Sequence, residues 1–161
     1  MRLSTVAVGS AVTILALSGL VASTASATPG SGATPSHRVD ATLDKSQDAK
    51  ADGIKLKLKD DAAVRSFTLT YAPGAYSGWH QHPGIVIAVV KEGAVLRKLP
   101  CQKAERFVAG QAFTEVGPHF VRNANREATG ASAVLLITQV VPAETPLDEY
   151  REDLPKPRCR S

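Results

Sequence analysis

The feature that most limits the possible folds is a series of short strand-like runs, separated by glycine and proline, between residues 53 and 142. Apolar and polar side chains alternate in most of these runs with a period of two, which is typical of strands that bury one face. The runs are residues 53–60, 63–71, 84–90, 94–99, 106–110, 111–117, 119–125 and 132–141. Short strands at this spacing predict an all-β sandwich or barrel. Only residues 147–153 have a pattern that permits a turn or two of helix.

One run differs from the alternating pattern. Residues 85–90 are apolar at every position, which predicts a strand buried on both faces. Its alternate side chains Ile85, Ile87 and Val89 would then be covered by an opposing sheet or by a partner subunit. A homodimer is therefore one expectation.

The first 27 residues have the organisation of a secretory signal peptide. Arg2 gives a positive start, residues 6–22 are uncharged and mostly apolar, and residues 25–27 (Ala-Ser-Ala) form a small-residue cleavage site. The apolar run is short for a membrane span and is not followed by a basic stop. We expect cleavage after residue 27, a secreted (extracellular) location and no membrane span afterwards.

The remaining chain divides into three parts. Residues 28–52 are mostly small, polar or charged and predict a flexible, disordered linker. Residues 53–143 form the β domain, and residues 144–161 form a short C-terminal tail. The two cysteines, Cys101 and Cys159, predict one disulfide in an oxidising compartment, which would tether the tail and stabilise the fold by about 4 kcal/mol. Two free thiols remain the alternative.

The charge of the chain gives little support for nucleic-acid binding. The net charge is +4 at pH 7, and several of the cations lie in the last few residues. No basic stripe with interleaved aromatic residues is present, so we expect no nucleic-acid partner.

Three of the four histidines suggest a metal site. His80 and His82 are two residues apart, so on a strand both project from the same face. His119 opens another apolar strand, and its ring could meet the other two inside a barrel. Three neutral imidazoles suit zinc, iron, copper or nickel. From these residues alone, a surface feature or a set of hydrogen-bonded core histidines is an equally good interpretation.

Residues 74–93 and 110–123 resemble the two sequence motifs of the cupin superfamily, in the right order. The matching positions are Gly74, His80, His82, Gly93, Gly110, His119 and Asn123. The resemblance covers roughly residues 53–142 and implies a single-domain jelly-roll β-barrel. It also implies a divalent metal ion (iron, zinc, copper, nickel or manganese) held by the three histidines, with Asn123 bracing a turn. The export signal and paired cysteines are similar to those of small secreted actinobacterial cupin-domain proteins.

The sequence departs from the cupin pattern at one ligand. The family's glutamate falls at Val86, so this carboxylate is absent from its usual strand. Glu92 lies in a turn and cannot easily substitute, and Glu115 is a distant stand-in for which a solvent-facing or loop-bracing role is the preferred interpretation. Three imidazoles alone would leave a divalent site with a charge of about +2, which favours an anionic or chelating ligand.

The expected ligand pocket is lined by Val86, Phe113 and Val121. On the first motif strand, no acidic or basic side chain is expected on the same face as His80 and His82. A general base beside the histidines is therefore missing, which argues against proton-transfer chemistry. The function implied is a secreted metal-dependent enzyme of dioxygenase type acting on a small molecule. The alternatives are a non-catalytic module that binds a sugar or an aromatic compound beside a weak or vestigial metal site, and a dimeric structural domain.

Overall fold

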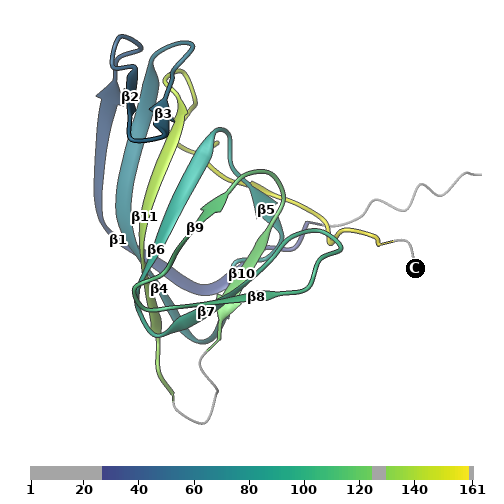
Figure 1. Ribbon diagram of the computed structural model, residues 1–161. Helices are drawn as coiled ribbons and strands as arrows, with labels where there is room; N and C mark the ends of the chain where they lie inside the picture. The colour runs from purple at the N-terminus through teal and green to yellow at the C-terminus, as the bar shows by residue number, and fades with distance from the viewer. Residues whose placement is uncertain (1–26, 125–129, 160–161) are drawn as a thin grey trace, which may run out of the picture.

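A computed structural model describes residues 27–124 and 130–159, and these residues contain strands, turns and loops but no helix (Figure 1). The strands are β1 (Ser31–Leu43), β2 (Ala49–Ala51), β3 (Ile54–Leu56), β4 (Ala62–Tyr76), β5 (His80–Gln81), β6 (Ile85–Glu92), β7 (Ala94–Lys98), β8 (Glu105–Val108), β9 (Ala112–Glu115), β10 (Phe120–Asn123), β11 (Ala133–Pro142) and β12 (Glu152–Asp153). The expected all-β class is confirmed.

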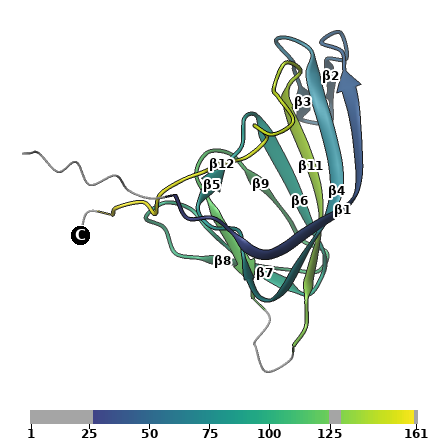
Figure 2. The same ribbon diagram turned by 180° about the vertical axis from the view of Figure 1, so that it is seen from behind.

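One antiparallel sheet of eight strands curls into a nearly closed barrel (Figures 1 and 2). Its strand order is β8-β7-β10-β4-β11-β6-β9, and β1 pairs with β4 outside this path. Two small ladders, β12 with β5 and β2 with β3, are separate from it. The barrel encloses an apolar core, whose buried members include Val90, Val95 and Leu135. Burial of each of these side chains contributes about 2 kcal/mol to stability.

The expectation of a linker at residues 28–52 is wrong. Residues 31–43 form β1, which pairs with β4 from Leu43↔Ala62 to Ser31↔Tyr76, and residues 49–51 form β2. The side chains of β1 are almost all exposed, so main-chain hydrogen bonds to β4 hold this strand rather than apolar burial. Composition predicts disorder from a lack of apolar side chains and therefore misses a strand of this kind.

The two faces of β6 are not equally buried. Val86 and Ala88 are fully buried inside the barrel, whereas Ile85 is 50% exposed and Ile87 44% exposed. The prediction of burial on both faces is therefore wrong for the described residues, because no second sheet covers the outer surface of this strand. A partner subunit remains the other expected cover.

The C-terminal tail is ordered by pairing with the barrel. Residues 147–153 form turns and the short strand β12, which pairs with β5, so the prediction of a helical turn there is wrong. The backbone of Leu154 continues this contact by donating a hydrogen bond to Trp79. The predicted disulfide between Cys101 and Cys159 is confirmed, with 5.4 Å between the two Cα atoms.

The predicted signal peptide lies outside the described residues except for Ala27. Within the described part of the chain, we find no helix with the length and apolar character needed to cross a bilayer.

Candidate metal centre

The three histidines of the two motif segments meet at one end of the barrel interior. His80 begins β5, His82 follows this strand, and His119 directly precedes β10. The main chains of His80 and His119 form an isolated antiparallel bridge with hydrogen bonds of 3.0 and 2.9 Å. Their ring centroids are 4.0 Å apart, and that of His82 lies 4.9 Å from His80 and 5.4 Å from His119. The expected convergence of these rings is confirmed.

Two glycines fix the path of the loop that carries His80 and His82. Gly78 has φ +70° and Gly84 has φ +82°, a region that side chains with a Cβ rarely adopt. A Cβ on Gly78 would lie 1.7 Å from the carbonyl oxygen of Thr28, and one on Gly84 would lie 2.1 Å from that of Val140. The two glycines therefore allow the loop to lie directly against neighbouring backbone.

Each of the three imidazoles is oriented by a backbone carbonyl. The Nδ1 atoms donate hydrogen bonds from His80 to Gly78 (3.1 Å), from His82 to Tyr150 (2.6 Å) and from His119 to Gly117 (2.8 Å). Because a carbonyl oxygen can only accept, each Nδ1 carries the proton and each Nε2 presents a lone pair. This arrangement is typical of metal-binding histidines, whose second nitrogen is held by a carbonyl or carboxylate.

The carboxylate that the sequence lacks at position 86 comes from the neighbouring strand. Glu115 is only 6% exposed, and its Oε2 lies 3.2 Å from Nε2 of His119 and 3.6 Å from Nε2 of His82. The predictions of an absent carboxylate and of a solvent-facing or loop-bracing Glu115 are therefore both wrong. With Glu115 in the set, a divalent ion would leave a net site charge of about +1 instead of +2.

The register of β6 and β9 explains why Glu115 can take this position. Val86 and Glu115 are directly opposite each other in the antiparallel ladder, so their side chains project from the same face at neighbouring points. The alternation of side chains along one strand does not reveal which residue lies opposite it in the ladder. The available signal was the position of Glu115 two residues after Phe113, which was expected to point inward.

The four side chains fit a metal ion. One ligand atom from each of His80, His82, Glu115 and His119 lies within 4.8 Å of all the others. Two atoms bound to the same ion are at most about 4.4 Å apart, twice a bond length of about 2.2 Å. The set therefore needs to contract by only a few tenths of an ångström.

The electrostatics of the cluster also favour a cation. The Nε2 of His119 is buried and has no hydrogen-bond partner, although it faces the Glu115 carboxylate. Imidazole lone pairs and a carboxylate oxygen repel one another at these distances unless positive charge lies between them. A metal ion or a proton at this point would remove the repulsion.

Burial keeps two of the imidazoles neutral. The pKa of His80 is lowered to about 2, mainly by burial and to a smaller extent by the nearby His119, Arg151 and His82. The pKa of His82 is also lowered, mainly by burial. Both side chains are therefore neutral near pH 7, which is the form that binds metals.

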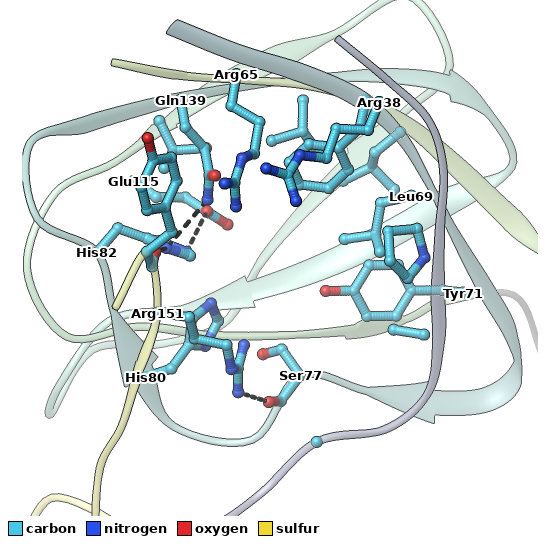
Figure 3. A pocket seen from close by; sticks show the side chains of 18 of the residues that line it. Arg38, Arg65, Leu69, Tyr71, Ser77, His80, His82, Glu115, Gln139 and Arg151 are labelled. Carbon is cyan, nitrogen blue, oxygen red and sulfur yellow. Dashed lines mark hydrogen bonds and ion pairs between the residues drawn. The ribbon is translucent and has the colours of Figure 1, made fainter. Parts of the chain in front are cut away.

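A cavity of about 470 Å³ opens beside the cluster (Figure 3). Val86 lies in its wall, as expected, together with His80, His82 and Glu115. The other two expected pocket residues, Phe113 and Val121, belong to the buried core and are not part of this wall. The ring of Phe113 packs against the ring of Phe107, with 4.6 Å between the ring centroids, so the Phe113 side chain is part of the core.

Three arginines that the sequence pattern did not predict as site residues also line the cavity. Arg65 has the inward parity of β4, Arg38 comes from β1, and Arg151 comes from the tail just before β12. A charged residue at an inward position of the run 63–71 was a usable signal for Arg65. Arg38 and Arg151 fall in segments that were expected to be linker and tail, so nothing in the pattern selected them.

Arg38 reaches the cavity because β1 is irregular at this point. The register of β1 on β4 shifts between Ser36 and Val39, so His37 and Arg38 together stand opposite Phe67. His37 has φ 52°, which accommodates the extra residue. Bulges of this kind change the direction of a side chain, and this one lets Arg38 join the cavity wall.

Comparisons with known proteins give only distant likenesses of fold. No protein-family model and no curated protein matches the chain. Similar solved structures include a cupin-like protein from Thermotoga maritima (20% identity, TM-score 0.45, covering 58% of this chain and 65% of that one). They also include an oxalate oxidase (21%, 0.40, covering 49% and 45%) and the cupin domain of a transcriptional regulator from Enterobacter cloacae (21%, 0.39, covering 48% and 80%).

The aligned part spans less than two thirds of the first two of these chains.

Proposed function

We propose that this protein binds one divalent transition-metal ion through His80, His82, His119 and Glu115. The observation that carries the proposal is the convergence of three oriented Nε2 lone pairs and one buried carboxylate. The resemblance of residues 74–93 and 110–123 to cupin motifs supports the same assignment. Iron, manganese, copper, nickel and zinc all accept such a mixed nitrogen and oxygen set.

The catalytic function that we propose is dioxygenase chemistry on a small organic molecule. A redox-active metal would supply electron exchange with dioxygen and Lewis acidity at this site. The chain itself contributes a cavity beside the metal cluster whose apolar wall, formed in part by Val86, Leu135 and Ile137, can pack against an organic molecule. Among the described residues of this wall, the carboxylate nearest the histidines is that of Glu115, which would be a ligand of the metal. It would then not be free to act as a general base, so proton abstraction is not favoured.

The second candidate is a non-catalytic module that binds a small ligand. The observation that favours it is the cavity itself, which has a size typical of ligand sites and a largely apolar wall. These properties would allow a ligand to bind whether or not a reaction is catalysed. Oxygen uptake separates the two candidates. Consumption of dioxygen with a thiol, flavonoid or diketone and at least one of iron, manganese, copper or nickel would support the enzyme, and binding without consumption would support the module.

Elemental analysis of the purified, untagged protein tests the metal site. We expect about one metal ion per chain, and we expect the double variant His80→Ala/His82→Ala to lose it. His37→Ala is the matched control, because His37 is exposed and its Nδ1 contacts only the hydroxyl of Ser36. An unchanged metal content in the double variant would overturn the proposal.

We also propose secretion and a homodimer. The predicted signal peptide and the disulfide between Cys101 and Cys159 support an extracellular location. The exposed side chains of Ile85, Ile87 and Leu136, on adjacent strands β6 and β11, support a dimer, because a two-fold axis would place the same apolar face of a second copy against them.

A further inference from the structure

We infer that the cavity beside the metal cluster binds a small organic carboxylate whose apolar body lies along the barrel wall. The inference rests on the proposed function in that both use the same cavity, and it goes beyond that function by naming the ligand class. Figure 3 shows the groups that carry it: the guanidinium groups of Arg65 and Arg38 and the hydroxyl of Tyr71 point toward one open space.

Arg65 supplies the first argument, because its charge is buried and incompletely paired. The residue is 7% exposed and lies in the cavity wall. Its Nε donates a hydrogen bond of 3.0 Å to Asp40, but its Nη2 is buried and has no hydrogen-bond partner. A buried N–H group without an acceptor is costly. An anionic oxygen in the cavity would satisfy it and would form a charge-assisted hydrogen bond.

The orientation of Arg65 is fixed before any ligand arrives. Its guanidinium carbon lies 3.6 Å from the centre of the Tyr150 ring, a cation–π contact, and its Nε is held by the carboxylate of Asp40. Little side-chain freedom remains to be lost on binding, and such preorganisation favours affinity.

The positive charges that face the cavity are not fully balanced by nearby acidic groups, so one anion can be accommodated. Asp40 is shared by two cations, since it also forms an ion pair with Arg38 at 2.6 Å. Glu115 faces the metal cluster, and Asp148, the other acidic residue of the wall, is solvent-exposed, so its charge is screened. A bound divalent ion would add further positive charge, which a carboxylate complements.

The neutral part of the wall defines the rest of the ligand. Tyr71 is buried, and burial raises the pKa of its hydroxyl, so the hydroxyl stays protonated and can donate to an oxygen. The apolar part of the wall is formed mainly by Phe67, Leu69, Val86, Leu135 and Ile137. A volume of about 470 Å³ exceeds what a carboxylate group alone would fill. The chemistry therefore fits an anionic head with an apolar body.

Isothermal titration calorimetry with three probes tests this inference. Hexanoate has the anionic head and the apolar body, acetate has only the head, and hexan-1-amine has the body with the opposite charge. We expect hexanoate to bind metal-loaded protein with a dissociation constant of about 1 mM or tighter. We expect acetate to bind at least tenfold more weakly and hexan-1-amine to give no binding heat. Absence of hexanoate binding, or equal binding of the amine, would overturn the inference.

Variants assign the binding to the arginine. Arg65→Met keeps an unbranched side chain that reaches as far as the Nε position but removes the guanidinium charge, and we expect at least tenfold weaker hexanoate binding. Arg106→Met is the matched control, because Arg106 is an exposed arginine of β8 outside the cavity wall. Tyr71→Phe, which preserves the ring in the core, should weaken binding severalfold and serves as the second variant should Arg65→Met fold poorly. Unchanged affinity in a folded Arg65→Met protein, or in Tyr71→Phe where only that variant folds, would overturn the assignment.

Failure of this inference is distinguishable from failure of the metal site. Metal content is measured by elemental analysis, and hexanoate is titrated into both metal-loaded and chelator-treated protein. One metal ion per chain without hexanoate binding would overturn only the carboxylate site. Arg65-dependent hexanoate binding in a protein that takes up no metal even when metal is supplied would support the carboxylate site and overturn the metal proposal.

Discussion

Replacement of Glu115 by valine should abolish most metal binding while leaving the metal-free barrel at least as stable as before. The carboxylate is one of four ligand groups, and loss of even an outer-shell partner of a metal ligand weakens affinity 10- to 100-fold. We therefore expect at least about 100-fold weaker binding, or about 2.7 kcal/mol. The metal-free protein should not suffer, because valine removes a buried charge that faces imidazole lone pairs.

Thermal unfolding with and without metal measures both effects. At a metal concentration 100 times the wild-type dissociation constant, binding stabilises the folded state by about 2.7 kcal/mol, and the same concentration would stabilise Glu115→Val by only about 0.4 kcal/mol. For a domain of this size the shift in melting temperature should fall from about 10 °C to about 1–2 °C. A variant that kept the full shift would refute the role of Glu115.

The cross-strand register allows a stricter test in the double variant Val86→Glu/Glu115→Val. Because positions 86 and 115 are directly opposite on β6 and β9, moving the carboxylate from one to the other keeps it on the same face. We expect the metal-induced shift to return in part. Glu92→Val is the matched control, since Glu92 is an exposed glutamate at the end of β6, and it should leave the shift unchanged. If the metal-induced shift in melting temperature did not return in a folded double variant, a carboxylate on the correct face of the sheet would not be sufficient to bind the metal.

Three further predictions concern the rest of the molecule. Cys101→Ser/Cys159→Ser should lower the free energy of unfolding by about 4 kcal/mol in urea titrations, because the bridge closes a loop with a sequence separation of 58; a loss below about 1 kcal/mol would contradict this. Metal-free protein should lose stability as the pH falls below 6.5, because the unfolded chain takes up a proton that the folded chain cannot take up at His80, whose pKa is lowered to about 2. From pH 6.5 to 4.5 this residue alone should cost about 2 kcal/mol, and a slope unchanged in a folded His80→Gln variant would be the contrary result. Ile87→Lys should convert the proposed dimer to a monomer in light scattering, whereas a monomeric wild-type protein would exclude this interface at the concentration tested.

The barrel strands that bury one face could be predicted from sequence, whereas β1 could not. Alternation predicted β4, and the apolar run at residues 132–141 predicted β11; the inner side chains of both strands enter the core. By contrast, β1 has almost no buried side chains and is held by the backbone of β4. A strand that is held mainly by hydrogen bonds to its partner does not need an alternating pattern of apolar and polar residues, so its sequence does not reveal it.

The candidate site divides in a similar way. The histidines could be predicted as site residues because His80 and His82 are two residues apart, and because His119 lies in a segment that resembles the second cupin motif. Glu115 and Arg38 could not be assigned, because their positions depend on the register of β9 with β6 and on a bulge in the pairing of β1 with β4. Register between strands far apart in sequence is a property of the folded sheet, so reasoning along a single strand does not reach it.

The carbonyl of Tyr150 that orients His82 belongs to the same tail that Cys159 ties to the barrel. Oxidation of the cysteine pair and loading of the ion are therefore energetically linked, since anything that loosens the tail also frees the His82 ring to rotate. We expect the reduced chain to bind metal more weakly than the oxidised one, which competition with a chelator in the presence of a reductant would measure. For a chain that crosses a membrane before its thiols are oxidised, this coupling would delay capture of the ion until after export.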